Sequence, residues 1–376
     1  MEMKRTFHPV GHGAFYTERF YDGENNIANI VFDCGCFEVG KEGQYKKRIE
    51  NNIKSEFQKG VKIDALFISH FHQDHILGVQ FLIKHCSVDK IFIPVLTPSV
   101  VIEAYLYIYN MGYKINCYAN NLLRRYYLTM PKNIITINEF EDGIQPTEDP
   151  IILDETTVQS SIDSPSVIRM GRGTNWLYIP YNRKDPRYQE LIEKIPQEKG
   201  FENIINDGKV DIDALSKTIS RSGVSKCKKI YKSIFGDKHN SYSMTLYSGR
   251  ACREQGCLPA CLRSIEEGRN HKLCTINCLY MGDYEAKKEG YFDSLQRFYS
   301  GYWGHIGLLQ VPHHGSYKNY NEGLYAPEKI CIISAGITDK YRHPDQPTLD
   351  GILGNNCIPI IVTENPKTKQ QFTYNI

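Results

Sequence analysis

The sequence predicts an α/β protein in which short buried strands alternate with amphipathic helices. Short runs rich in aliphatic and aromatic residues recur along the chain, and several of them end at Gly, Asp, His or Pro, where strands commonly pass into loops. Between these runs, apolar residues recur with the helical period. The predicted strands are Ile27–Phe32, Ala65–Ser69, Lys90–Pro94, Trp176–Ile179, Ser243–Tyr247, Leu279–Met281, Leu308–Val311, Ile330–Ser334 and Ile358–Val362. The predicted helices are Ile76–His85, Val100–Met111, Asp211–Ser220, Glu285–Tyr299 and Asp345–Leu353.

Composition and charge narrow the class of protein. Of 376 residues, 41% are hydrophobic and 23% are charged, which is typical of a globular protein. The formal net charge of +2 argues against attachment to long DNA or anionic membranes by bulk charge. Met1–Phe7 lacks the apolar stretch of a secretory signal, and no apolar run approaches the ~20 residues that span a bilayer. We therefore expect a cytoplasmic protein without a membrane partner, whose thiols stay reduced.

The chain is expected to form a single domain, residues 1–376, with two insertions. Residues 183–238 are polar, helix-prone and rich in Lys and Glu, whereas residues 250–278 carry a cluster of cysteines between two predicted strands. Thiolates in this number could close a structural zinc site, but their spacing is not that of a common zinc finger. A further structural zinc and unliganded thiols therefore remain equal alternatives for Cys252, Cys257, Cys261, Cys274 and Cys278.

The strongest chemical signal is a loop rich in histidine. A predicted strand runs directly into His70-Phe-His72-Gln-Asp74-His75, and a helix follows. Zinc accepts imidazole nitrogen and carboxylate oxygen, but ligands this closely spaced cannot all reach one tetrahedral ion, so the loop predicts two adjacent ions. His70 and His72 suit one ion, and Asp74 and His75 suit the other. The alternative, in which Asp74 caps the helix and the histidines are surface residues, does not explain why four such groups gather at one strand end.

Three later segments supply further candidate ligands, each after a predicted strand. Asp283 ends Leu279-Tyr-Met-Gly-Asp and could bridge two cations, His313 and His314 follow the strand ending at Val311, and His343 lies after a third strand. Asp33 follows the strand Ile27–Phe32 and could orient a ligand imidazole from behind. Each segment alone is weak, but their joint occurrence strengthens the prediction of a metal site.

These motifs resemble a known superfamily. The loop His70-x-His72-x-Asp74-His75 resembles the signature of the metallo-β-lactamase fold. Met281-Gly-Asp283, Val311–Ser316 and Tyr341–Pro344 are similar to segments of the soluble hydrolase domain of bacterial DNA-internalisation competence proteins. The resemblance runs from about Ile27 to the C-terminus, is interrupted by the two insertions, and includes no membrane channel. It implies an αββα sandwich, the metallo-β-lactamase fold with insertions, with metals at one edge.

The resemblance also implies a ligand set. One ion would be held by His70, His72 and one histidine of the 313/314 pair, and the other by Asp74, His75 and His343, with Asp283 between them. It favours His314 as the ligand and His313 as a proton donor or substrate contact, although the sequence alone leaves that choice open. The expected cofactors are two zinc ions, with manganese or iron as alternatives.

A pair of cations predicts hydrolysis. Two ions can activate a shared water and stabilise the attacking and leaving oxygens. A phosphodiester benefits most because its transition state spreads negative charge over oxygens, so we expect a phosphodiesterase or nuclease acting on nucleic acid or a nucleotide. Asp74, His313 and Tyr317 are the predicted catalytic residues. The alternatives are a carboxylic ester, lactone or thioester hydrolase, and a non-catalytic metal-binding regulatory module; no protein partner is indicated.

Overall fold

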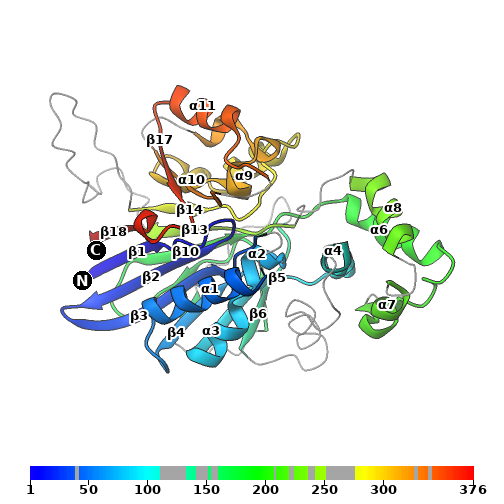
Figure 1. The fold of residues 1–376 in the computed structure, drawn as a ribbon, viewed down its shortest axis with the longest axis horizontal. Helices are drawn as coiled ribbons and strands as arrows, with labels where there is room; N and C mark the ends of the chain where they lie inside the picture. The colour runs from blue at the N-terminus through cyan, green and yellow to red at the C-terminus, as the bar shows by residue number, and fades with distance from the viewer. Residues whose placement is uncertain are drawn as a thin grey trace.

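Two large β-sheets pack face to face and carry helices on their outer surfaces (Figure 1). This arrangement is the predicted αββα sandwich, the metallo-β-lactamase fold. The computed structural model describes residues 1–38, 42–110, 133–140, 151–153, 160–206, 209–219, 224–235, 242–250, 276–325, 329–337 and 341–376. Within these residues, no helix is both long enough and apolar enough to span a membrane.

The first sheet has the strand order β18-β1-β2-β3-β4-β5-β6-β8. Strands β3, β4, β5 and β6 run parallel, so the chain segments that leave β3 and β4 emerge at the same edge. These two segments carry Asp33 and the histidine loop. The strands are β1 (Glu2–Phe7), β2 (Phe15–Asp22), β3 (Asn25–Cys34), β4 (Lys62–Phe67), β5 (Ser87–Pro94), β6 (Ile134–Ile137), β8 (Ser161–Ile162) and β18 (Gln370–Asn375).

The second sheet has the strand order β17-β16-β15-β14-β13-β10-β9-β7. Strands β14 to β17 run parallel, and the loops after β14, β15 and β16 bring Asp283, the 313/314 histidines and His343 to one edge. The strands are β7 (Ile151–Ile152), β9 (Ile168–Arg169), β10 (Trp176–Tyr181), β13 (Thr245–Arg250), β14 (Cys278–Tyr280), β15 (Leu308–Gln310), β16 (Ile330–Ser334) and β17 (Ile358–Val362).

Helices cover both outer faces of the sandwich (Figure 1). The first sheet is covered by α1 (Glu42–Glu56), α2 (Gln73–Ile76) and α3 (Val79–His85). The second sheet is covered by α9 (Tyr291–Phe298), α10 (Ser300–Trp303) and α11 (Gln346–Gly354). Single 3-10 turns complete the loops: η3 (Pro312–Gly315), η4 (Tyr317–Asn319), η5 (Glu322–Leu324) and η6 (Pro366–Thr368).

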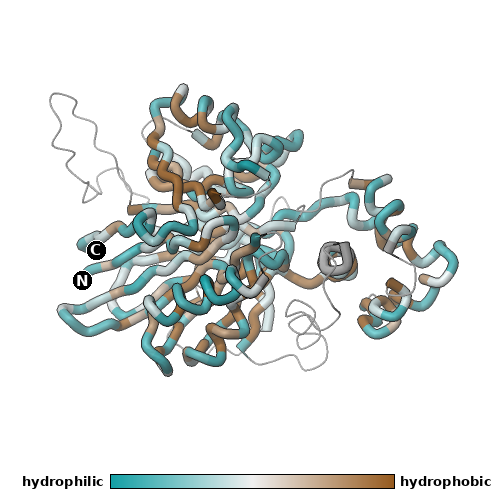
Figure 2. Tube along the Cα trace, viewed as in Figure 1, coloured by the Kyte–Doolittle hydropathy of each residue, from teal (hydrophilic) through white to brown (hydrophobic). Residues whose placement is uncertain are grey.

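The core consists of three apolar layers, one between the sheets and one beneath each set of helices. The central layer is rich in stacked aromatic rings, including Tyr16, Phe32 and Tyr280, whose centroids lie 4.8–6.3 Å apart. Figure 2 shows apolar residues concentrated along the strands and polar residues on the outer turns. Burial of an apolar or aromatic side chain contributes about 1.5–3 kcal/mol, so this core fixes the relative position of the two sheets.

The first two strands were not predicted because they carry a buried ion pair. Arg5 and Glu18 are 0% and 2% exposed, and Arg5 Nε donates to Glu18 Oε1 at 2.8 Å. The Glu18 carboxylate also accepts hydrogen bonds from the hydroxyls of Tyr178, Tyr280 and Ser248, each at 2.8 Å. Because these charged residues lie on the buried face, the two strands lack the continuous apolar run from which a buried strand is predicted.

Two predicted helices have different limits in the structure. The predicted helix Ile76–His85 is divided into α2 and α3 near Gly78, whose amide donates to Cys34 O at 2.8 Å. The predicted helix Glu285–Tyr299 begins only at Tyr291, because Gly290 adopts a left-handed conformation with φ 72°. Residues 285–290 therefore form part of the loop that carries Asp283 away from β14.

The helical insertion leaves the second sheet between two neighbouring strands, β10 and β13, which pair antiparallel. In Figure 1 its helices lie to one side of the sandwich, next to α4. Glu103 on α4 is buried and accepts a hydrogen bond from Tyr188 OH at 2.8 Å. The elements of this side group are α4 (Pro98–Asn110), α6 (Arg187–Lys194), η1 (Ile195–Gln197), β11 (Ile205–Asn206), β12 (Lys209–Val210), α7 (Ile212–Thr218) and α8 (Val224–Phe235).

Candidate metal centre

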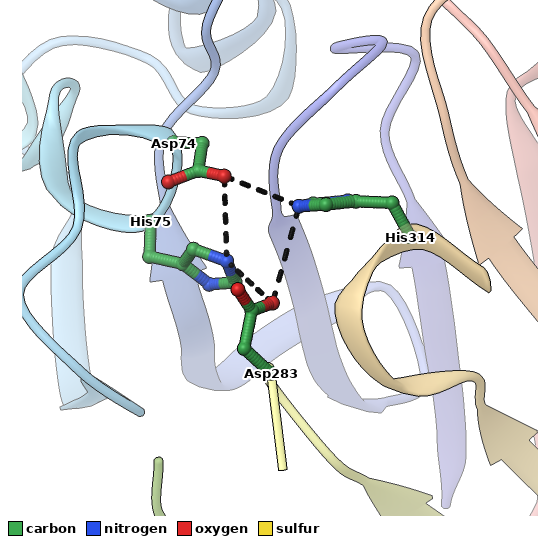
Figure 3. A group of neighbouring side chains, drawn as sticks. All are labelled: Asp74, His75, Asp283 and His314. Carbon is green, nitrogen blue, oxygen red and sulfur yellow. Dashed lines mark hydrogen bonds and ion pairs between the residues drawn. The ribbon is translucent and has the colours of Figure 1, made fainter. Parts of the chain in front are cut away.

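Two groups of buried side chains meet at the edge where the loops of both sheets converge. In each group the donor atoms lie within 4.8 Å of one another. The first donor group is His70, His72 and Asp283, and the second donor group is Asp74, His75, Asp283 and His314. Figure 3 shows the second donor group, with its side chains pointing toward a common centre. Ligands bound at ~2.0 Å to one tetrahedral ion lie about 3.3 Å apart, so distances of this order suit a cation.

Asp283 belongs to both groups, and its two oxygens face different partners. Oδ1 lies 3.1 Å from His75 Nε2 and 3.9 Å from His314 Nε2. Oδ2 lies 3.6 Å from His70 Nε2 and 3.5 Å from His313 Nδ1. Ser243 Oγ accepts a hydrogen bond from the Asp283 amide at 2.9 Å and helps to fix this loop. The sequence predicted that this carboxylate bridges two ions, and that role stays a prediction.

Asp33 lies behind the histidine loop and holds it in place. Its Oδ1 accepts a hydrogen bond from the Ser69 amide at 2.7 Å, and its Oδ2 accepts one from Ser69 Oγ, also at 2.7 Å. The same Oδ2 lies 2.7 Å from His75 Nδ1. This contact places the His75 proton on Nδ1 and turns Nε2 toward Asp283, so Asp33 is positioned to orient this imidazole.

His313 and His314 point to different parts of the site. Both residues adopt left-handed conformations, with φ 49° and φ 55°, and this unusual turn separates their rings. His314 Nδ1 lies 2.8 Å from Ser334 O, and its Nε2 lies 3.2 Å from Asp74 Oδ2. His313 is partly exposed beside Asp283. The structure therefore brings His314 next to Asp74, whereas the resemblance implies an ion shared with His70 and His72. Which ion His314 would bind stays a prediction.

His343 and Tyr317 lie at the rim of the site. His343 Nδ1 lies 3.3 Å from Asp345 Oδ1, and its ring centroid is 6.2 Å from that of His313. Within the described residues, neither donor group includes His343. The amide of Tyr317 donates to Asp345 Oδ2 at 2.7 Å, and its side chain is 41% exposed. The ligand role of His343 and the catalytic role of Tyr317 stay predictions.

His12 is a site residue that the sequence analysis missed. Its Nε2 lies 3.4 Å from Asp74 Oδ2, and its ring centroid is 3.9 Å from that of His314. It lies on the loop between β1 and β2, where Gly13 has φ +149° and a Cβ would lie 2.8 Å from Asp74 O. Only glycine allows the two backbones to approach this closely. The feature of the sequence that could have identified His12 is its position between two glycines after a strand.

Burial and charge act together on the ionisable groups. Burial opposes ionisation of Asp74, but His75, His12 and His314 hold its pKa well below the ordinary value. Burial likewise acts against the charge on Asp283, and His313, His75 and His70 hold its pKa low. Burial, reinforced by His75 and His72, lowers the pKa of His70 well below its usual value. Ionised carboxylates and a neutral imidazole are the forms that bind cations.

The chemistry of the donor set fits divalent cations. His70 Nε2 and Asp74 Oδ1 are buried and make no hydrogen bond within the described part of the chain. Buried polar atoms are normally satisfied, so such atoms aimed into a cluster of donors indicate a ligand. Imidazole nitrogen and carboxylate oxygen suit zinc, and also manganese or iron.

The structure describes one residue of the predicted cysteine cluster. Cys278 is buried in β14, and burial raises the pKa of its thiol to about 12. The side chain therefore behaves as a core thiol in this structure. The other four cysteines proposed for a structural zinc, Cys252, Cys257, Cys261 and Cys274, lie outside the described residues.

Comparison with known proteins finds similarity to one superfamily over part of the chain. Residues 24–149 match the sequence model of the metallo-beta-lactamase superfamily. Over 86 residues the chain is 29% identical to Ribonuclease J of Mycoplasma pneumoniae and 28% identical to Ribonuclease J of Mycoplasma genitalium. These alignments cover 23% of this chain and 15% of each relative. The sandwich and the superfamily match together define a metallo-β-lactamase fold.

A solved structure titled "Crystal Structure of a New Diphosphatase from the PhnP Family" aligns over 100% of both chains, at 10% identity and a TM-score of 0.38.

Proposed function

We propose that this protein is a metal-dependent hydrolase that cleaves a phosphodiester in nucleic acid or a nucleotide with two zinc ions. The observation that carries the proposal is Asp283, whose oxygens face two separate groups of buried donors. The superfamily match over residues 24–149 supports hydrolysis. The partial similarity to ribonucleases supports a phosphodiester.

The proposed assignment gives each donor group one ion. His70, His72 and Asp283 would hold the first, and the second donor group would hold the other, with His343 as a further ligand from the rim. Two cations bound there supply an activated water and neutralise charge that develops on the phosphoryl oxygens. Asp33 and Ser334 O hold the Nδ1 atoms of His75 and His314, so that the Nε2 atoms face inward.

His313 is assigned to the reacting end of the substrate. It is partly exposed and lies beside Asp283 Oδ2. Burial lowers the pKa of His313 to about 4, which makes the ring neutral at pH 7. A neutral ring can donate one N–H hydrogen bond to a phosphoryl or leaving oxygen. Asp74 would help to hold the second ion, and the Tyr317 hydroxyl is the proposed proton source for the leaving oxygen.

Two further expectations belong to the same proposal. Kinship with the hydrolase domain of competence proteins rests on the motifs around Asp283 and His314. A reducing cytoplasmic setting is the second expectation.

The test combines metal analysis with a substrate panel. Protein purified without chelators should contain about two zinc ions per chain, or about three if the cysteine insertion also binds one. It should cleave bis-p-nitrophenyl phosphate, single-stranded oligonucleotides or cyclic nucleotides in preference to an aryl ester. Asp283→Asn should lose metal and activity, whereas Asp293→Asn, on the exposed surface of α9, should keep both.

Two outcomes would contradict the proposal. Near-zero metal content would favour a regulatory module. Cleavage of the ester alone would make the substrate a carboxylic ester.

A further inference from the structure

Two exposed tyrosines flank the candidate metal centre. Large apolar side chains in the described residues are mostly buried, but Tyr317 is 41% exposed and Tyr341 is 43% exposed. Both lie on the loops that follow β15 and β16, which also carry the 313/314 histidines and His343. Exposed aromatic side chains gathered at a functional site commonly mark a binding surface.

Tyr341 is the exposed member of a cluster of rings that extends from the second donor group to the surface. His314, a member of the second donor group, lies 3.9 Å from His12 between ring centroids. The His12 ring lies 5.4 Å from the Tyr341 ring, with 29° between their planes. The His343 ring is nearly parallel to that of Tyr341, at 10° and 6.1 Å. A flat group stacked on Tyr341 would therefore lie beside a substrate bound at the metal donors.

Positive charge accompanies both tyrosines. Lys287 Nζ lies 3.4 Å from the centroid of the Tyr317 ring, and the side chain of Lys287 is exposed. Arg342, next to Tyr341, is exposed as well. The two loops are tied together by Asp345, which accepts from the Tyr317 amide at 2.7 Å and lies 3.3 Å from His343 Nδ1. We call Tyr317, Tyr341, Lys287 and Arg342 the rim platform.

We propose that the rim platform binds the unpaired bases and flanking phosphates of a single-stranded nucleic-acid substrate, with one base stacked on Tyr341. This inference rests on the proposed function and narrows its substrate class. Aromatic rings combined with cations are the usual means of binding single strands, because rings stack on bases and cations attract phosphates. A base inside a duplex is already stacked on its neighbours, so double-stranded substrates should be poor.

The test compares two short single-stranded oligonucleotides of the same length. One carries all its bases, and the other carries abasic residues on both sides of the scissile phosphate. Tyr341→Ala should lower kcat/KM for the complete oligonucleotide by about 5- to 100-fold, mainly through KM, and change that for the abasic one by less than about twofold. Tyr341→Phe, which keeps the aromatic ring, should keep the wild-type kcat/KM for the complete oligonucleotide. Leu353→Ala, which alters a 57% exposed side chain on α11, is the control for a general surface effect.

The outcomes separate this inference from the proposed function. If Tyr341→Ala lowers kcat/KM equally for both oligonucleotides, or for neither, the proposal that the rim platform stacks a base is wrong. If the wild-type protein cleaves neither oligonucleotide nor any other phosphodiester of the panel, the proposed function fails, and binding of the oligonucleotides measured by fluorescence anisotropy then decides the inference alone. The inference is supported if the wild-type protein binds the complete oligonucleotide more tightly than the abasic one and Tyr341→Ala removes that preference. It is contradicted if the wild-type protein binds the two oligonucleotides equally.

Discussion

His12 Nε2 lies 3.4 Å from Asp74 Oδ2, so the loop between the first two strands contributes a side chain to a site built otherwise from later loops. The same imidazole packs against His314, with ring centroids 3.9 Å apart and 37° between the planes. His12 is thus placed to hold a carboxylate and an imidazole of the second donor group in position.

His12→Phe should weaken metal binding at the second donor group by about 10- to 100-fold, because the ring is kept but the contact with Asp74 is lost. His12→Gln should bind metal more tightly than His12→Phe, since its amide can still donate to the carboxylate. Competition with a chromophoric chelator measures the affinity of each site. Equal affinities in wild type and His12→Phe would exclude a positioning role.

Asp33→Asn should also weaken the second site by about 10- to 100-fold. Asparagine tolerates the left-handed conformation of Asp33, φ 52°, but offers only one acceptor oxygen to Ser69 and His75. His75 then loses the contact that fixes its Nδ1 proton. Zinc content after dialysis against a weak chelator measures the change, with Asp293→Asn as the control. Full retention of both ions in Asp33→Asn would refute the assignment.

Glu103 should make stability depend on pH. Burial raises the pKa of Glu103 to about 8, against the opposing hydrogen bonds from Tyr188 and Tyr231. Because the protonated form is favoured only in the folded state, its contribution is complete below about pH 4.5 and is lost as pH rises toward 8. Within that window the free energy of unfolding should fall by up to about 1.4 kcal/mol per pH unit from this group.

Glu103→Gln removes the titration while keeping an acceptor for the tyrosines. Urea unfolding between pH 5 and pH 8 should therefore show a shallower decline for the variant, and the variant should be more stable than wild type at pH 8. Glu285 and Lys288 also act on Glu103, so Lys288→Met is measured in parallel. Identical slopes for wild type and Glu103→Gln would show that Glu103 does not titrate in this window.

Glu18→Ala should destabilise the fold by about 3–5 kcal/mol, because it leaves the Arg5 guanidinium buried without its carboxylate. The Tyr178 and Tyr280 hydroxyls lose their acceptor as well. Chemical denaturation measures the loss, and Glu24→Ala, at an exposed turn, should change stability by less than about 0.5 kcal/mol. A small effect at Glu18 would mean that water or another group replaces the carboxylate.

The apolar runs of the interior predicted most of the sandwich. The predicted strands Ile330–Ser334 and Ile358–Val362 have these limits in the structure, and the parallel arrangement follows from helices placed between strands. Strands β1 and β2 were not predicted because Arg5 and Glu18, which pair with each other inside the protein, interrupt the apolar pattern of these strands. A partner that lies far away in sequence cannot be recognised from a local pattern.

The sequence by itself determined the fold class and the types of side chain at the candidate metal centre, because burial imposes a period on apolar residues and cations require nitrogen and oxygen donors. Tertiary structure decided which donors face one another. The left-handed turn at His313 and His314 directs adjacent rings to different carboxylate oxygens, and the close approach at Gly13 brings His12 to Asp74. Backbone direction and packing between distant loops set these contacts, and neither is encoded in the spacing of residues along the chain.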